Sequence, residues 1–191
     1  MDKTAIVEES VEVLLDYSRI PISFEVCSVF EVRPVDQGLG GLTLSEETVD
    51  HPWVKNYDDF GENPASWAKR WNISNWGVLS AYVDDSRVGG CVIAYDTPGV
   101  HKLGDRPDIA VLWDIRIHPN FRGKGIGSKL LDEAVAWAAR RRCRMLMAET
   151  QNINVPACRF YAKHGFTLGV VTRFAYTEFP DEVELVWYKE L

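Results

Sequence analysis

The sequence predicts a single α/β domain over residues 1–191, in which helices cover the faces of a mixed (α+β) sheet. Its 191 residues suit one domain with a sizeable core. Its composition, 46% hydrophobic and 26% charged, is that of a folded protein rather than a disordered one. Runs with strand periodicity alternate along the chain with runs of helical periodicity, which favours this fold class.

The first third of the chain predicts short elements. Residues 6–17 predict a short helix, and Pro21 then forces an extended start to a strand over residues 24–32, where apolar side chains alternate. Residues 34–49 contain three glycines and predict a turn-rich stretch. An N-cap residue, a first-turn proline and helical spacing predict a short helix over residues 63–71.

The middle of the chain predicts a hairpin followed by a strand. Two β-rich runs, residues 76–83 and 88–95, are separated by a short polar stretch and predict antiparallel strands. A loop rich in proline and glycine covers residues 96–107, and a third strand follows over residues 109–117.

The last third predicts an amphipathic helix that begins at Ile126. Apolar residues recur there with helical spacing, and arginines at 140–142 suit its C-terminal end. The remaining elements are a strand over residues 145–149, a helix over 154–164 and a final hairpin over 166–188.

Charge and composition exclude several classes of function. The formal net charge of −7 disfavours nucleic acid and anionic membranes as partners and mildly favours a cationic small molecule. The four cysteines and four histidines lack the spacing of a disulfide scaffold or a metal site. We therefore expect no bound metal. The chain has no long apolar run and no signal-peptide pattern, so we expect a cytoplasmic location.

A glycine-rich turn joins the strand over residues 109–117 to the helix that begins at Ile126. The turn Arg122-Gly-Lys-Gly-Ile-Gly127 suits phosphate, because glycines let backbone amides approach an anion at the positive end of the helix dipole. Arg122 and Lys124 add positive charge. Pure packing also explains such a turn taken alone. The spacing matches neither a P-loop nor a dinucleotide-binding fingerprint.

Two motifs in a fixed order make the prediction of a phosphate-binding turn more specific. They are Arg122-x-x-Gly125-x-Gly127 and Asn154-x-x-Ala157-x-x-Phe160-Tyr161-x-x-x-Gly165-Phe166. Over residues 77–178 the chain therefore resembles the GNAT superfamily of acetyltransferases. The resemblance implies the GNAT acyl-CoA N-acyltransferase fold, in which two parallel strands, here residues 109–117 and 145–149, splay apart at a bulge. It also implies acetyl-CoA as co-substrate.

The resemblance also assigns the cofactor-binding residues. It implies that the backbone of Ile115 and Ile117 pairs with the pantetheine arm and that Asn154 holds the other side of that arm. The pyrophosphate is then held by the backbone amides of Gly123, Lys124, Gly125, Ile126, Gly127 and Ser128.

Three residues are candidates for the chemistry. Tyr161 is the candidate general acid, because a phenol near the sulfur can protonate the departing thiolate; a packed tyrosine on an amphipathic helix is the alternative. Asp114 and Glu149 are the candidate bases, because a carboxylate can accept the proton of the acceptor amine directly or through a water molecule. Either acid alternatively binds substrate or pairs with an arginine. Side chains alternate along a strand, so Asp114 and Ile115 are expected on opposite faces.

Within the superfamily, the stretch Glu149-Thr-Gln151 makes the chain most similar to the streptothricin acetyltransferases. That resemblance implies antibiotic resistance by acetylation of a cationic amine. Candidate substrate-binding residues are the acids Asp58, Asp59 and Glu62, together with Trp76. A tryptophan, Trp113, stands where a second acid is expected beside Asp114.

Other functions remain open at this stage. A GNAT enzyme that acetylates a polyamine, an amino sugar or a protein N-terminus is the alternative, and a non-catalytic acyl-CoA-binding module is a further one. Dimers are common in the family, so a homodimer is also an expectation.

Overall fold

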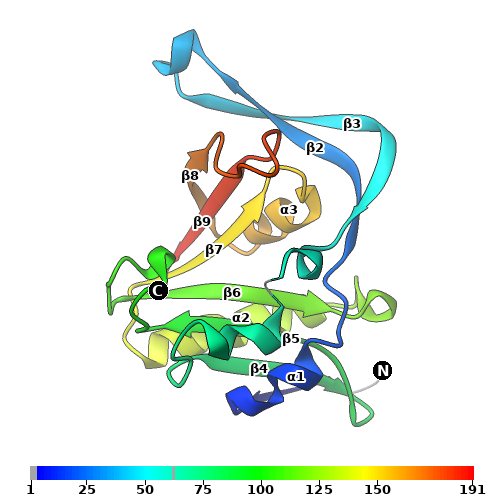
Figure 1. Cartoon of the computed structure of the whole chain (residues 1–191), viewed down its shortest axis with the longest axis vertical. Helices are drawn as coiled ribbons and strands as arrows, with labels where there is room; N and C mark the ends of the chain where they lie inside the picture. Colours follow the sequence, from blue (N-terminus) through cyan, green and yellow to red (C-terminus); the bar gives the residue numbers. More distant parts are fainter. Residues whose placement is uncertain (1–3, 62) are drawn as a thin grey trace. The chain divides into compact units, whose positions relative to one another are not determined.

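The computed structural model describes residues 4–61 and 63–191, which form two compact units (Figure 1). The first unit runs to Ser23, resumes over Asn56–Met147 and ends with Glu190–Leu191. The second unit comprises Phe24–Lys55 and Ala148–Lys189.

The first unit contains antiparallel strands in the order β1-β4-β5-β6. These are β1 (Ala5–Glu9), β4 (Gly77–Val83), β5 (Ser86–Tyr95) and β6 (Ile109–Ile117). Strand β7 (Met145–Gln151) follows β6 in the strand order and passes into the second unit after Met147. The predicted hairpin over residues 76–95 is confirmed, and Asp84 and Asp85 both have positive φ, as a two-residue hairpin turn requires.

Helix α2 (Ile126–Arg140) packs on β4, β5 and β6 (Figure 1). Its apolar stripe is buried against them and consists of Ile126, Leu130, Leu131, Ala134, Trp137 and Ala138. The helix therefore begins at the predicted residue, and burial of its apolar face stabilises it. The strand over residues 109–117 is also confirmed with the predicted bounds.

The prediction of a helix over residues 6–17 is wrong for its first half. Residues Ala5–Glu9 form β1, which pairs with the edge of β4. Only η1 (Val11–Val13) and α1 (Leu14–Tyr17) are helical. Pairing with a sheet edge gives the backbone of this segment its hydrogen bonds, and the β-branched Ile6 and Val7 suit a strand.

Short 3-10 helices lie elsewhere in the first unit. The helix expected over residues 63–71 is a 3-10 helix, η4 (Pro64–Lys69), preceded by η3 (Tyr57–Phe60). Two more, η5 (His101–Leu103) and η6 (Pro119–Phe121), lie in the loops before and after β6. Helix η4 contacts α1, and its buried residues Pro64 and Trp67 fasten it to the unit.

The second unit carries a long antiparallel ribbon made of β2 (Phe24–Pro34) and β3 (Leu42–Lys55) (Figure 1). The turn-rich stretch expected over residues 34–49 is shorter than predicted, because pairing with β2 makes Leu42 onward a strand and leaves only η2 (Asp36–Gly38) and its neighbours as a turn. Helix α3 (Val155–Lys163) and the antiparallel strands β8 (Thr167–Thr172) and β9 (Glu184–Glu190) match the predicted C-terminal elements.

Within residues 4–61 and 63–191, no helix is long and apolar enough to cross a membrane.

Candidate active site

The glycine-rich turn has an open backbone at the start of α2. Gly123 and Gly125 have φ of 75° and 79°, and no atom lies within 4 Å of the position that a Cβ would take at either residue. The first hydrogen bond of the helix runs from the Lys129 amide to the Gly125 carbonyl at 3.2 Å. The amides of Ile126 and Gly127 therefore have no acceptor within the helix and lie at the positive end of its dipole. This arrangement can bind a phosphate group.

Arg122 fastens this turn to neighbouring backbone. Its Nε donates to the Ile117 carbonyl at 3.0 Å, and Nη2 donates to the carbonyls of Ser23 at 2.8 Å and Pro21 at 3.4 Å. Lys124 is exposed, and its Nζ lies 4.9 Å from the centre of the Phe121 ring. Lys124 can thus meet an anion from solvent, whereas the Arg122 guanidinium is engaged by carbonyl oxygens.

A buried ionic network lies on one face of β6. The Arg116 side chain is 1% exposed and donates to Asp114 from Nε at 2.9 Å and from Nη2 at 2.6 Å. It also donates to both oxygens of Asp58, at 3.0 and 3.2 Å, and to the Ile20 carbonyl at 3.0 Å. The fully buried phenol of Tyr17 donates to Asp114 as well. Asp114, Asp58 and Arg116 are thus held as one unit.

The pKa values of this network follow from burial and charge. Burial, and then the negative charge of Asp114, raise the pKa of the Tyr17 phenol well above its usual value. Burial alone lowers the pKa of Arg116, but the hydrogen bond and the charge of Asp114 outweigh it and raise the pKa. Tyr17 therefore keeps its proton and Arg116 its charge at neutral pH.

A β-bulge in β6 sets the direction of these side chains. Val92 and Ile93 of β5 pair with Asp114 and Leu112, which leaves Trp113 as the extra residue. Trp113 contacts the Trp67 ring of η4, while its neighbour Asp114 contacts Tyr17 of α1. The consecutive side chains of Trp113 and Asp114 thus contact η4 and α1, and these two elements pack on each other.

The side chains of Ile115 and Ile117 lie on the opposite face of β6 from those of Asp114 and Arg116. A Cβ at Gly89, the β5 partner of Ile117, would lie 2.6 Å from the Ile117 side chain. Both isoleucines are half-buried, whereas Asp114 and Arg116 are buried. The expected alternation therefore holds after the bulge.

Trp76 belongs to a cluster of indole rings. The centroid of its ring lies 5.9, 6.0 and 5.4 Å from those of Trp67, Trp71 and Trp113, respectively. Trp76 is 5% exposed, and its Nε1 donates to Thr97 Oγ1 at 2.9 Å. Its contacts are those of a core residue, whereas Trp71 and Trp113 are half-buried.

The three predicted acids before η4 have different surroundings. Asp58 is half-buried and paired with Arg116. Asp59 is exposed and accepts a hydrogen bond from Asn56 Nδ2 at 2.7 Å. Glu62 lies outside the described residues. Asp59 is therefore the more accessible of the two described carboxylates.

In the second unit, Glu149 of β7 is held by a tyrosine from the loop between β8 and β9. The Tyr176 hydroxyl donates to Glu149 Oε1 at 2.7 Å. Gln151 Nε2 donates to the Tyr176 oxygen at 2.8 Å and reaches Glu149 Oε1 at 3.5 Å. Glu149 is half-buried.

The two residues of the second motif lie at the start and in the middle of α3. Asn154 caps the helix, and its Oδ1 accepts from the Ala157 amide at 3.2 Å. Tyr161 is 4% exposed, and its ring packs on those of Phe166 and Trp187 at centroid distances of 5.5 and 6.4 Å. Tight packing fixes the direction of the phenol.

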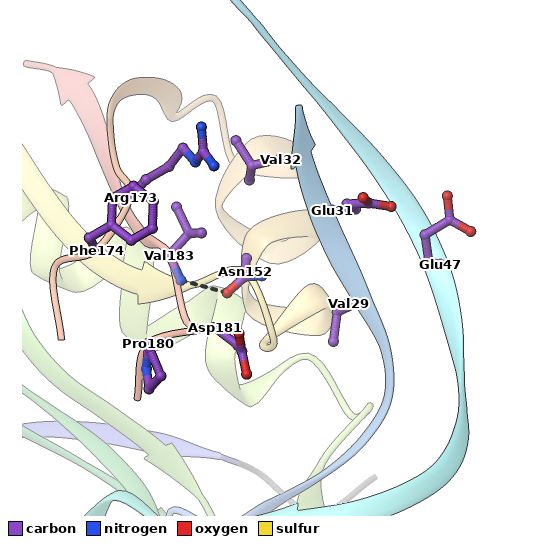
Figure 2. Close-up of a pocket in the computed structure, with 10 residues that line it drawn as sticks. All are labelled: Val29, Glu31, Val32, Glu47, Asn152, Arg173, Phe174, Pro180, Asp181 and Val183. Carbon is purple, nitrogen blue, oxygen red and sulfur yellow. Dashed lines mark hydrogen bonds between the residues drawn. The ribbon is translucent and has the colours of Figure 1, made fainter. Parts of the chain in front are cut away.

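The second unit contains a cavity of about 350 Å³. Figure 2 shows its lining side chains, most of which come from the β2–β3 ribbon and the β8–β9 loop. Asn152 joins the two walls: its Oδ1 accepts from the Val183 amide at 2.8 Å, and its Nδ2 donates to the Phe30 carbonyl at 3.0 Å. The charged lining residues are Glu31, Glu47, Asp181 and Arg173. None of them was singled out from the sequence.

Several residues of these networks escaped prediction. Arg116 carried a usable signal, because Asp114 and Arg116 stand two apart on a strand and so share a face. Tyr17 and Tyr176 carried no such signal, because each lies far in the sequence from the carboxylate that it contacts. Among the described residues, no group of three or more histidine, cysteine, aspartate or glutamate side chains is arranged to hold a metal ion.

Comparisons with known proteins give the family and the fold. The family model described as "Acetyltransferase (GNAT) family" matches residues 44–166. A streptothricin acetyltransferase of Escherichia coli is 32% identical over 192 aligned positions, which cover 97% of this chain and 94% of that protein. Streptothricin acetyltransferase A of Bacillus subtilis (strain 168) is 32% identical over 151 positions, which cover 78% of this chain and 80% of that protein.

A solved structure supports the same fold. The crystal structure of a Bacillus anthracis str. Ames protein in complex with acetyl coenzyme A has a TM-score of 0.78 and 24% identity to this chain. The match covers 99% of this chain and 100% of that one. The predicted fold class, a mixed sheet with helices, is confirmed.

Proposed function

Because the chain belongs to the acetyltransferase (GNAT) family, which takes acetyl-CoA as acetyl donor, we propose that its acceptor is a primary amine of a small cationic molecule of the streptothricin type. One observation carries this proposal: the 32% identity to a streptothricin acetyltransferase over almost the whole of both chains. Acetylation of such an amine removes a positive charge, so the biological role would be antibiotic resistance.

The charge of the protein supports a cationic acceptor. The chain carries 28 acidic and 21 basic residues, and its field attracts cations. We propose that Asp59, with Asp58 and Glu62 nearby in the sequence, attracts the acceptor. Trp71 and Trp113, which belong to the cluster that contains Trp76, are half-buried, and their rings suit contact with a cation or a sugar ring.

The donor side of the site is proposed from the turn that precedes α2. The open backbone at Gly123 and Gly125 and the amides of Ile126 and Gly127 fit a pyrophosphate, and exposed Lys124 adds charge. We propose that Ser128 completes this set, that the backbone of Ile115 and Ile117 contacts the pantetheine arm, and that Asn154 does so from α3. Arg122 is proposed to act by holding the turn in place.

The chemistry needs one base and one acid. We propose Glu149 as the group that accepts the proton of the acceptor ammonium, directly or through a water molecule. The amine nitrogen then forms a bond to the acetyl carbon while the carbon–sulfur bond breaks, and the Tyr161 hydroxyl gives its proton to the departing sulfur. Asp114 is less suited to the base role, because Arg116 donates to both of its oxygens and Tyr17 also donates to it, so its oxygens are already engaged.

A panel of amines tests the acceptor. The purified protein is incubated with acetyl-CoA and, in separate reactions, streptothricin, spermidine, an amino sugar and a peptide with a free N-terminus, while release of the CoA thiol is followed. Cys27 is exposed and would react with a thiol reagent, so Cys27→Ser is the better parent protein. Turnover with streptothricin is expected.

Two results would overturn the proposal. Turnover with spermidine, the sugar or the peptide, and none with streptothricin, would assign the chain to the alternative acceptors. Calorimetric binding of acetyl-CoA without turnover on any amine would instead favour a non-catalytic acyl-CoA-binding module.

A further inference from the structure

We propose that Tyr176 is a positioning residue for acetyl transfer, whose phenol holds the Glu149 carboxylate in one orientation. This inference rests on the proposed function, in which Glu149 is the base. It also gives a physical role to the stretch Glu149-Thr150-Gln151, on which the resemblance to the streptothricin acetyltransferases rests.

Glu149 and Gln151 stand two residues apart on β7. Residues two apart on a strand point to the same side of it, so both side chains leave β7 in one direction. Thr150, between them, is 4% exposed and points the other way. Tyr176 lies within hydrogen-bond distance of both, at 2.7 Å from Glu149 and 2.8 Å from Gln151.

The donors and acceptors present fix the direction of the hydrogen bonds between Gln151, Tyr176 and Glu149. The Gln151 amide nitrogen carries only donors, so the Tyr176 oxygen must accept from it. The phenolic hydrogen of Tyr176 is then directed at Glu149, which as a carboxylate can only accept. Burial, and then the charge of Glu149, raise the pKa of the Tyr176 phenol, so the phenol keeps its proton. Gln151 thus fixes Tyr176 as a donor to Glu149.

Contacts other than the Tyr176–Glu149 hydrogen bond also attach the β8–β9 loop. The Val183 amide is bound by Asn152, and Glu182 pairs with the buried Lys55 at 2.5 Å. Lys55 also lies 3.5 Å from the centre of the Phe179 ring. Loss of the Tyr176 hydroxyl should therefore leave the loop in place and change mainly Glu149.

Removal of one hydroxyl tests the inference. Tyr176→Phe keeps the ring and deletes the donor, and Tyr82→Phe is a matched control, since Tyr82 donates to Glu9 at 3.2 Å in the first unit. With the acceptor that the amine panel identifies, Tyr176→Phe should lower kcat about 10-fold and leave the KM for acetyl-CoA unchanged. Tyr82→Phe should keep the wild-type kcat.

A double-mutant cycle separates a role through Glu149 from a structural one. If Tyr176 acts through Glu149, Tyr176→Phe should have no further effect on kcat in a Glu149→Gln background. An equal fall in both backgrounds, or a wild-type kcat for Tyr176→Phe beside a slow Glu149→Gln, would overturn the inference while leaving Glu149 as base. A wild-type kcat for Glu149→Gln would instead remove the base role, and the inference with it.

The same four proteins give a test that needs no turnover. Urea unfolding of the wild type, both single variants and the double variant measures the coupling between Tyr176 and Glu149. A non-additive loss of stability is expected, because one hydrogen bond joins them. Additive losses would contradict the bond itself, whatever the acceptor proves to be.

Discussion

Arg116 donates to both carboxylate oxygens of Asp58, at 3.0 and 3.2 Å, and thereby joins β6 to η3. The Arg116 side chain is 1% exposed and that of Asp58 is 23% exposed, so the pair is largely shielded from water. Because the same guanidinium also binds Asp114, one buried cation serves two acids. The charge of Asp58 is therefore partly compensated before any substrate arrives, which separates its role from that of exposed Asp59.

Arg116→Met should destabilise the protein strongly. The substitution leaves Asp58 and Asp114 without their cation, and removal of one partner from a buried ion pair costs about 3–5 kcal/mol. Urea unfolding at neutral pH measures this loss. Arg19→Met is the control, because Arg19 and Asp16 form an exposed pair worth about 1 kcal/mol or less. Similar losses for the two variants would show that the buried network contributes little.

Asp59→Asn should weaken binding of a cationic acceptor without weakening the fold. An exposed carboxylate contributes about 0.5–1 kcal/mol to an ionic contact, which corresponds to a rise of roughly 2- to 5-fold in the acceptor KM. Asp58→Asn should mainly lower stability, because it breaks the pair with Arg116. Steady-state kinetics and unfolding curves distinguish these effects. An unchanged acceptor KM in Asp59→Asn would remove this acid from substrate binding.

The fold could be predicted where periodicity and burial agree. The strand over residues 109–117 and the helix from Ile126 were predicted with their observed starts, because both have long, strongly patterned sequences. The segment over residues 6–17 could not be, since its conversion to β1 depends on the edge of β4, which begins at Gly77. A short segment with a helical pattern becomes a strand here because it pairs with a sheet edge that forms only when the chain folds.

The site could be predicted in part. The backbone turn before α2 follows from local glycine spacing, so the sequence suffices for it. The Arg116 and Tyr176 networks depend on partners far away in the chain, and the bulge at Trp113 changes which side chains share a direction. Such contacts are properties of the fold rather than of any segment, which is why spacing alone left the roles of Asp58, Asp114 and Glu149 open.

Gly125→Ala should weaken binding of acetyl-CoA. A Cβ at Gly125 meets no atom, so the effect comes from the left-handed backbone, which costs a residue with a side chain about 1–2 kcal/mol. We expect the Kd for acetyl-CoA to rise by roughly 5- to 30-fold if the turn relaxes away from this conformation. Calorimetry measures it. Gly41→Ala, with φ of +87° and equally open surroundings, is the matched control and should bind acetyl-CoA normally.

Arg122→Lys should behave like Arg122→Gln. The guanidinium donates to three backbone carbonyls in different directions, and a lysine ammonium cannot reproduce that fork. If Arg122 acts by holding the turn, both variants should raise the KM for acetyl-CoA by a similar factor, of about 10-fold, since each loses these bonds. A near-normal KM for Arg122→Lys beside a raised KM for Arg122→Gln would show instead that charge on the phosphate is what matters.

Tyr161→Phe should slow acetyl transfer by about 10²-fold or more, because it deletes the proton donor to the departing sulfur. The substitution keeps the ring that packs on Phe166 and Trp187, so stability and the KM for acetyl-CoA should change little. Tyr161→Leu is the comparison, since it removes the ring as well and should also lower the unfolding temperature. If Tyr161 is a packing residue only, Tyr161→Phe will turn over at the wild-type rate while Tyr161→Leu is destabilised, and another group must then protonate the thiolate.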